Sequence, residues 1–375
     1  MSPKLPRIDL RVFTVFLFGA LPVLAVGVIL VLGIGQARLR DSYGRQLVEV
    51  AEQTTATVDR YVFRRIIDGS ILARVPDVQR LAVSESQRSL DAEAVRTLDK
   101  QWTGERVVPA ALREVMNNPT ARFFAGIVEH DPVYREIMLT DRLGRLIAAS
   151  NRTSDYYQAD EPWWREAFDD GVHGRVSVSD VVWDESARAY AIDIAVPVTD
   201  PATGNLVGIM KASADVREML APIAGIRLGT TGQAALVRED GSLVFSRTSP
   251  TPGARFFAAD LLPERLQAIR KAGPRFGTYF SARDPEGNTE LIGIAGSQLG
   301  QSYPALSWLV AVYQANDELL APVENQFWYL LLVLVMTVIA VLGLALWFSM
   351  RLAAFPVDVE IGPAHQPTPS TVEAA

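Results

Sequence analysis

The chain has 375 residues, a formal net charge of −7, 49% hydrophobic residues, 3 histidines and no cysteine. A net negative charge argues against nucleic-acid binding, which needs a concentrated basic face. The lack of cysteine excludes disulfides, thiolate chemistry, iron–sulfur clusters and Cys-ligated zinc. The length allows two or three ordinary domains.

Two long stretches, residues 12–35 and 327–350, contain no charged side chain. Each exceeds the roughly 20 residues that a helix needs to cross a bilayer, so the sequence predicts two transmembrane helices. A cleaved signal peptide is the alternative for the first stretch, because Lys4, Arg7 and Arg11 form a basic start. Its apolar part is longer than the roughly 7–15 residues of a signal peptide, which favours an uncleaved anchor.

Basic residues next to the two stretches predict the orientation. Lys4, Arg7 and Arg11 precede the first stretch and Arg351 follows the second. Positively charged flanks remain in the cytoplasm, so residues 1–11 and 351–375 are expected there. Residues 36–326 are then expected outside the cytoplasm. The chain is predicted to be a two-pass protein of the cell inner membrane, with its large domain in the periplasm or outside the cell. The proline-rich tail 351–375 is expected to be disordered and to hold no output domain.

The first half of the outer segment predicts helices and then strands. An apolar stripe at intervals of three or four residues predicts a long helix over 37–74, continuous with the first membrane helix. Further helices are predicted at 89–103 and 109–117, the latter stopped by Asn118 and Pro119. A hairpin (135–140 and 145–150), a helix (161–169) and three antiparallel strands (175–182, 189–198 and 206–215) follow.

The same order of elements then recurs. It comprises a hairpin at 233–237 and 243–246, a helix at 259–271 and strands at 277–282, 290–297 and 307–313. This internal repeat predicts two tandem α+β modules with antiparallel sheets, at about 77–220 and 221–322.

Particular runs of residues resemble a known family. The runs are 155–168 (DYYQADEPWWREAF), 178–180, 191–198, 208–216 and 229–234. Over about residues 37–324 the chain resembles the double Cache sensor domain of bacterial chemoreceptors, histidine kinases and cyclases. The resemblance implies two PAS-like modules on a long N-terminal helix, a ligand pocket in the membrane-distal first module, and a homodimer.

The resemblance also implies site residues. The aromatic and acidic positions of amino-acid-binding members match Tyr156, Trp163, Trp164 and Asp215, whereas Glu161 stands where they have arginine. Asp180, Asp184 and Asp193 lie in or beside the three-stranded part, where one of them can enter the pocket. Aromatic faces and carboxylates suit a cation, which gives the hypothesis of a small amine or other cationic metabolite. Anion binding stays open through other arginines, namely Arg152, Arg165 and Arg175.

No catalytic motif is found. The histidines have no metal-ligand spacing, and no phosphate-binding loop or nucleophile motif occurs, so no enzyme activity, metal or cofactor is expected. The favoured function is a membrane-anchored small-molecule sensor that signals through a separate kinase or cyclase. The alternatives are an envelope scaffold whose outer domain binds a protein, and a hydrolase that uses outer-domain carboxylates.

Overall fold

The computed structural model describes residues 10–88, 91–104, 112–184, 189–248, 252–272 and 277–354. Residues Asp41–Leu319 form one compact unit, and the chain on either side of them belongs to another. The helices are α1 (Leu10–Leu72), α2 (Pro76–Ser86), α3 (Ala92–Gly104), α4 (Glu114–Asn117), α5 (Pro119–His130), α6 (Pro162–Phe168), α7 (Arg217–Gly225), α8 (Leu262–Ala272) and α9 (Asn316–Ala354), with short 3₁₀ helices η2 (Ala259–Leu261), η3 (Leu299–Gln301) and η4 (Pro304–Leu306).

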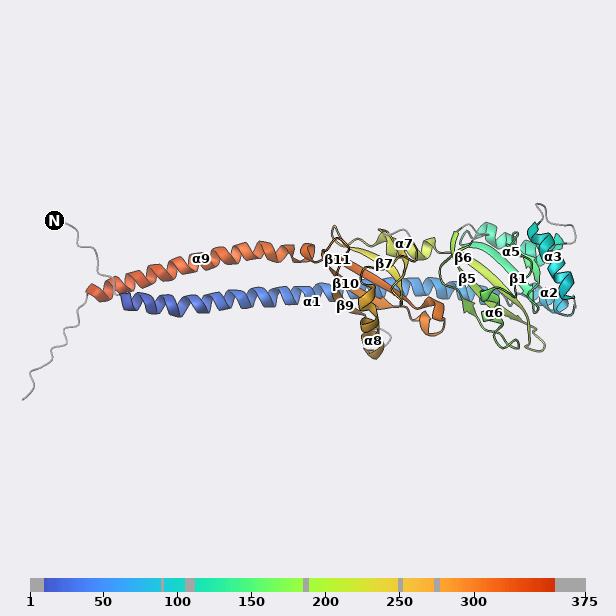
Figure 1. Ribbon diagram of the computed structural model, residues 1–375, viewed down its shortest axis with the longest axis horizontal. Helices are drawn as coiled ribbons and strands as arrows, with labels where there is room; N and C mark the ends of the chain where they lie inside the picture. Colours follow the sequence, from blue (N-terminus) through green and yellow to red (C-terminus); the bar gives the residue numbers. More distant parts are fainter. Residues whose placement is uncertain are drawn as a thin grey trace, which may run out of the picture. The chain divides into compact units, whose positions relative to one another are not determined.

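The strands form two antiparallel sheets that follow each other along α1 (Figure 1). The first sheet has the order β2-β1-β6-β5-β3, with β4 paired to β5, and the second has the order β8-β7-β11-β10-β9. The strands are β1 (Tyr134–Asp141), β2 (Leu146–Ala149), β3 (Ser177–Val178), β4 (Val182–Asp184), β5 (Ala189–Thr199), β6 (Leu206–Asp215), β7 (Gln233–Arg238), β8 (Leu243–Ser246), β9 (Thr278–Arg283), β10 (Thr289–Gly296) and β11 (Trp308–Ala315). The two strand orders are equivalent, which confirms the α+β fold with an internal repeat. We call the parts built on these sheets the first and second modules.

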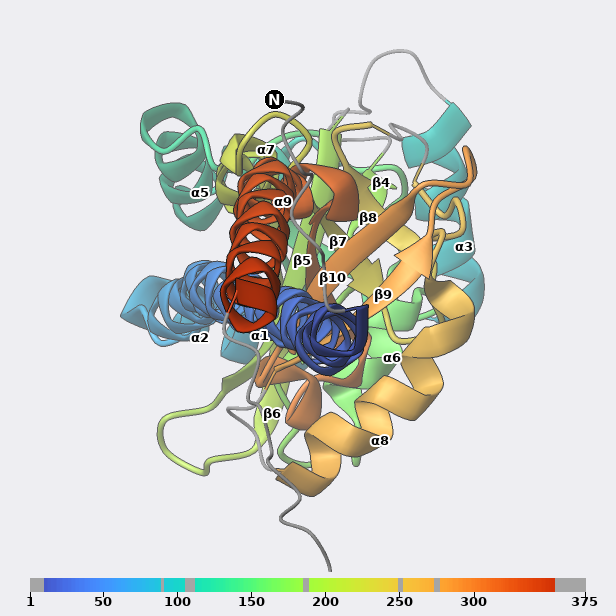
Figure 2. The same ribbon diagram turned by 90° about the vertical axis from the view of Figure 1, so that its left-hand side faces the viewer.

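Helix α1 packs against both sheets. Its buried residues Leu47, Ala51, Val58, Val62 and Ile66 are spaced by four or seven residues, so they form one apolar stripe. They belong to a hydrophobic core that also contains residues of both sheets and of α2, α5 and α7. The opposite sheet faces are covered by α3, α4 and α6 in the first module and by α8 in the second. Figure 2 shows α6 and α8 on the same side of the unit, away from α5 and α7.

The contact of α1 with the second sheet requires a glycine on β10. A β carbon at Gly293 would lie 2.5 Å from both the carbonyl carbon of Leu47 and the backbone nitrogen of Val48. We expect Gly293→Ala to lower the free energy of unfolding by about 1–3 kcal/mol, because helix backbone cannot move aside like a side chain. Gly296→Ala on the same strand is the matched control, since its nearest neighbour would be Leu309 Cδ2 at 3.5 Å. Chemical denaturation of both variants measures the difference, and equal midpoints would contradict the expectation.

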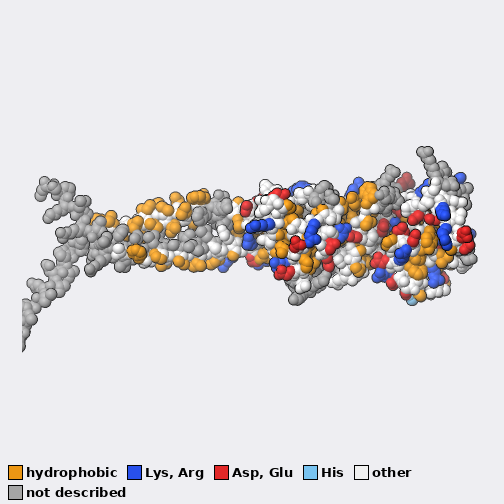
Figure 3. All heavy atoms as spheres, in the orientation of Figure 1, with side chains coloured by type: hydrophobic (Ala, Val, Ile, Leu, Met, Phe, Trp, Pro, Cys, Tyr) orange, Lys and Arg blue, Asp and Glu red, His pale blue; other side chains and the backbone are white. Residues whose placement is uncertain are grey.

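Among the described residues, one helical segment is long and apolar enough to cross a membrane. It is Trp328–Phe348 within α9, with a mean hydropathy of 2.9. Trp328 and Tyr329 at its start are 68% and 72% exposed, as expected for aromatic residues at a membrane interface. Hydrophobic side chains line this part of α9 on the face shown in Figure 3. Residues 12–35 are helical, as part of α1, and their membrane insertion stays a prediction.

Some elements differ from the predictions. Helices α2, α5 and α7 were not predicted, and the strand predicted at 175–182 is interrupted between β3 and β4. The helix predicted at 109–117 is helical at Glu114–Asn117, and residues 105–111 lie outside the described residues.

Candidate ligand-binding site

A row of polar side chains crosses the first sheet on the face covered by α6. In the strand register, Ser213 of β6 lies opposite Glu136 of β1 and opposite Asp193 of β5. The hydroxyl of Ser213 donates a 2.5 Å hydrogen bond to Asp193 Oδ1. Glu136 and Ser213 are fully buried, so this row lies within the module.

Lys211, two residues before Ser213 on the same face of β6, brings a positive charge to the row. Its Nζ lies 3.6 Å from Glu136 Oε1 and 3.7 Å from Asp193 Oδ2. The same nitrogen lies 5.4 Å from the ring centroid of Trp163, within the range of a cation–π interaction. We call Glu136, Asp193, Lys211, Ser213 and Trp163 the distal polar cluster.

The charged groups of the distal polar cluster are two carboxylates and one ammonium group. The side chains of Glu136, Lys211 and Asp193 are only 1%, 8% and 13% exposed. Buried charges are stable when they are paired with opposite charges. The two carboxylates and the Trp163 ring suit an ammonium group, and the Lys211 ammonium suits a carboxylate on the same molecule.

Trp163 reaches the cluster because α6 is fixed by its neighbouring tryptophan. Pro162 starts the helix, and Glu161 is its N-cap without a side-chain capping bond. Trp164 Nε1 donates a 3.0 Å hydrogen bond to Thr140 Oγ1, and its ring stacks on Phe168 at 4.6 Å. Trp164 is thus part of the core, and it holds Trp163 against Lys211.

Tyr156 lies beside the open edge of β2. Its carbonyl oxygen accepts a hydrogen bond from the Leu146 nitrogen, and its own nitrogen donates to Asp99 Oδ1 at 2.9 Å. Its ring is buried and packs near Trp102, with a centroid distance of 6.3 Å. Burial, and after it the negative charge of Glu161, raise the pKa of the neighbouring Asp155 to about 6.

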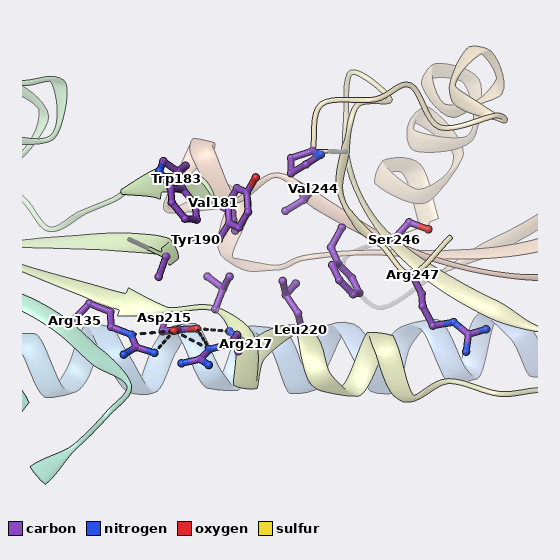
Figure 4. A pocket seen from close by; sticks show the side chains of 14 residues that line it. Arg135, Val181, Trp183, Tyr190, Asp215, Arg217, Leu220, Val244, Ser246 and Arg247 are labelled. Atoms are coloured by element: carbon purple, nitrogen blue, oxygen red, sulfur yellow. Dashed lines mark hydrogen bonds and ion pairs between the residues drawn. The ribbon is translucent and has the colours of Figure 1, made fainter. Parts of the chain in front are cut away.

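Asp215 does not join the distal polar cluster. It ends β6, where Asp215 Oδ2 accepts from Arg135 Nη2 at 2.6 Å and from Arg217 Nε at 2.9 Å. These residues line a separate cavity (Figure 4). Asp184 ends β4, and its side chain lies outside the described residues.

The alternative arginines have contacts elsewhere. Arg152 lies over the ring of Trp102, Arg165 donates to the carbonyl oxygen of Ala159, and Arg175 pairs with Glu166. Of the predicted candidates, Trp163 and Asp193 are brought together, through Lys211.

Sequence reasoning missed Glu136, Lys211 and Ser213. A signal was present for Lys211, since it is a lysine in the middle of the otherwise apolar strand 206–212. Glu136 and Ser213 gave no local signal, because their proximity depends on the pairing of β1 with β6.

The described residues contain no group of three or more histidine, aspartate or glutamate side chains placed to hold a metal ion. Within the distal polar cluster, the lysine and the two acids form ion pairs with one another. The distal polar cluster combines charged groups with an aromatic face.

Comparisons with solved structures find similar ligand-binding domains. The domain of the amino acid chemoreceptor PctB of Pseudomonas aeruginosa PAO1 in complex with L-Gln is 16% identical, with a TM-score of 0.44 over 73% of this chain and 91% of that one. The domain of the Campylobacter jejuni chemoreceptor Tlp3 in complex with L-norvaline is 11% identical, with a TM-score of 0.48 over 75% and 94%. The extracellular domain of the putative histidine kinase rpHK1S-Z16 is 15% identical, with a TM-score of 0.41 over 68% and 94%.

No curated protein matches the chain by sequence. The model of the dCache_1 family, described as a Cache domain, matches residues 36–323. This match covers most of the chain and includes both sheets. The chain belongs to the dCache_1 family of Cache domains.

Proposed function

We propose that the protein is a membrane-anchored, extracytoplasmic sensor of a small metabolite that carries an ammonium group. The ligand would bind at the distal polar cluster of the first module. The observation that carries this proposal is the pairing of two buried carboxylates with one lysine beneath Trp163. The chemoreceptor domains to which the chain is similar are complexed with amino acids, which supports the same class of ligand.

The two carboxylates and the aromatic ring favour the same ligand group. An ammonium ion near Glu136 and Asp193 gains two counter-charges, and Trp163 adds cation–π attraction in a desolvated site. A ligand carboxylate would pair with Lys211, so amino acids and simple amines are both candidates. The protein acts in this proposal by binding, with no chemical step.

Binding would be transmitted through β6 to α1. Ser213 of the cluster lies two residues before Asp215, whose carbonyl oxygen accepts a 2.7 Å hydrogen bond from the hydroxyl of Tyr61 on α1. A ligand that prefers one conformation of β6 would shift the population of states available to α1. The signal would reach a separate kinase or cyclase through two membrane helices whose ends lie in the cytoplasm, and the protein would act as a homodimer.

Thermal unfolding of the full-length protein in nanodiscs tests the ligand class. Matched pairs of compounds are compared, such as alanine with propionate and putrescine with butanediol. In each pair we expect only the ammonium compound to raise the unfolding temperature. Asp193→Asn should lower the affinity for that compound about tenfold, because one charge-assisted contact is lost. Asp260→Asn, in an exposed pair with Arg255 in the second module, is the control and should bind normally.

Three results would each contradict part of the proposal. Stabilisation by carboxylates or sugars, with none by amines or amino acids, would rule out the ammonium ligand. Protection of residues 36–326 from protease added to spheroplasts would rule out the outer location. Recovery from gentle detergent without any kinase or cyclase would argue against signalling to a separate enzyme.

A further inference from the structure

A cavity lies between the two modules. Its volume is about 640 Å³, and it is lined by β4, β5 and the end of β6 from the first module, by α7, and by β8 from the second. Small-molecule sites commonly have volumes of about 300–1,000 Å³. The cavity is separate from the distal polar cluster, none of whose residues lines it.

One side of the cavity is aromatic. Trp183 of β4 and Tyr190 of β5 meet edge to face, with ring centroids 5.2 Å apart, and they are 48% and 41% exposed. Leu220, Val244 and Phe245 extend the apolar lining toward the second module. An exposed aromatic pair of this kind offers stacking surface to a flat ring.

The other side carries an excess of positive charge. Arg135 and Arg217 both pair with the single carboxylate of Asp215, and Figure 4 shows this group opposite the two rings. Arg217 Nε donates to Asp215, whereas the two terminal nitrogens of Arg217 form no hydrogen bond with the described residues. Its side chain is 76% exposed, so these donors are accessible from the cavity. Guanidinium donors of this kind bind carboxylates in a bidentate manner.

We propose that this cavity binds an aromatic carboxylate, with its ring against Trp183 and Tyr190 and its carboxylate on Arg217. The ligand would contact both modules at once. Asp180 of the first module links the two directly, because it accepts hydrogen bonds from Arg238 and from Trp308 Nε1 of the second. A ligand in the cavity adds contacts between the same two modules, so it favours the conformation in which they pack against each other. This site goes beyond the proposed function, because it is independent of the distal polar cluster.

Calorimetric titration of the full-length protein in nanodiscs tests the site with a matched set of probes. The anion is 4-hydroxyphenylacetate and the neutral analogue is 4-hydroxyphenylacetamide. We expect the anion to bind at least tenfold more tightly than the amide. Arg217→Gln should weaken its binding by about tenfold, and Trp183→Ala should also weaken it. Arg283→Gln, at an exposed position of β9 outside the cavity, should leave it unchanged.

The distal polar cluster supplies a further control. Trp163→Ala should leave binding of 4-hydroxyphenylacetate unchanged, because Trp163 does not line this cavity. If Trp163→Ala abolishes binding and Arg217→Gln does not, the anion binds at the distal site and the proposal is wrong. Equal affinity for the acid and its amide, or no binding of the acid at millimolar concentration, would also overturn it. The comparison of the acid with its amide does not depend on whether an ammonium ligand binds to the first module, because neither compound carries an ammonium group.

Discussion

Asp141→Asn is expected to lower the free energy of unfolding by about 3–5 kcal/mol, the cost of breaking a buried ion pair by removing one partner. Asp141 ends β1, and its carboxylate pairs with Arg145 across the turn of the first hairpin. Their side chains are 0% and 3% exposed. Without the negative charge, the guanidinium of Arg145 would remain buried and uncompensated.

The surroundings of this pair explain why the charge cannot escape to solvent. Asp141 Oδ1 also accepts from the backbone nitrogens of Leu143 and Arg145, each at 2.9 Å. Arg145 Nη2 donates to the carbonyl oxygens of Glu85 and Arg88, at the end of α2. The pair therefore connects the hairpin to α2, and Gly144, with φ of 83°, closes the turn where a β carbon would meet Ala159.

The second hairpin supplies the matched control. Asp240 lies in the turn of the second hairpin, just before Gly241, and it is exposed. Its Oδ1 accepts hydrogen bonds from the backbone nitrogen and the hydroxyl of Ser242. Asp240→Asn should cost about 1 kcal/mol, the usual net value of such hydrogen bonds. Urea unfolding of both variants, with Asp141→Asn/Arg145→Met as the charge-free pair, measures the difference. Similar losses for Asp141→Asn and Asp240→Asn would refute the role assigned to the buried pair.

Lys211→Met is expected to destabilise the first module by a similar amount, about 3–5 kcal/mol. The substitution keeps the length and apolar stem of the side chain but removes the ammonium group. Glu136 and Asp193 would then face each other across Ser213 without the Lys211 ammonium group, in a position where Glu136 is fully buried. Loss of the contact with the Trp163 ring adds to the effect.

A second substitution separates charge from packing. Glu136→Gln in the Lys211→Met background removes one of the two carboxylates, so it should restore much of the lost stability. Lys100→Met, at an exposed position of α3 in the same module, should change the unfolding midpoint little. If the double variant is no more stable than Lys211→Met, the loss comes from packing and the charge argument fails.

Most of the fold could be predicted from the sequence, because strands with alternating or continuous apolar residues and glycine turns have local signatures. The missed helices α2 and α5 show where local signals are ambiguous. The sequence predicts that Pro119 helps to end a helix, yet Pro119 occupies the first turn of α5, as Pro76 does in α2. Asn118 confirms this second use of proline, because its side chain accepts a hydrogen bond from the Ala121 nitrogen as an N-cap.

The interruption between β3 and β4 could not be predicted, because its cause lies far away in the sequence. Asp180 sits at the break and bonds to Arg238 and Trp308 of the second module. The neighbours of the candidate site residues likewise depend on distant parts of the sequence. Trp163 and Asp193 carry local or family signals, whereas the contact of Asp215 with Arg135 depends on the pairing of β1 with β6.

The shared position of α1 has a thermodynamic consequence. Leu47 contacts Gly293 of the second sheet, and Gly69 lies against Val196 of the first. One helix therefore packs against both sheets over 22 residues, or about 33 Å. Unfolding of either sheet would expose apolar residues of α1, and it would thereby destabilise the helix against which the other sheet packs. The domain should therefore lose its structure in a single calorimetric transition, although its repeat suggests two melting units.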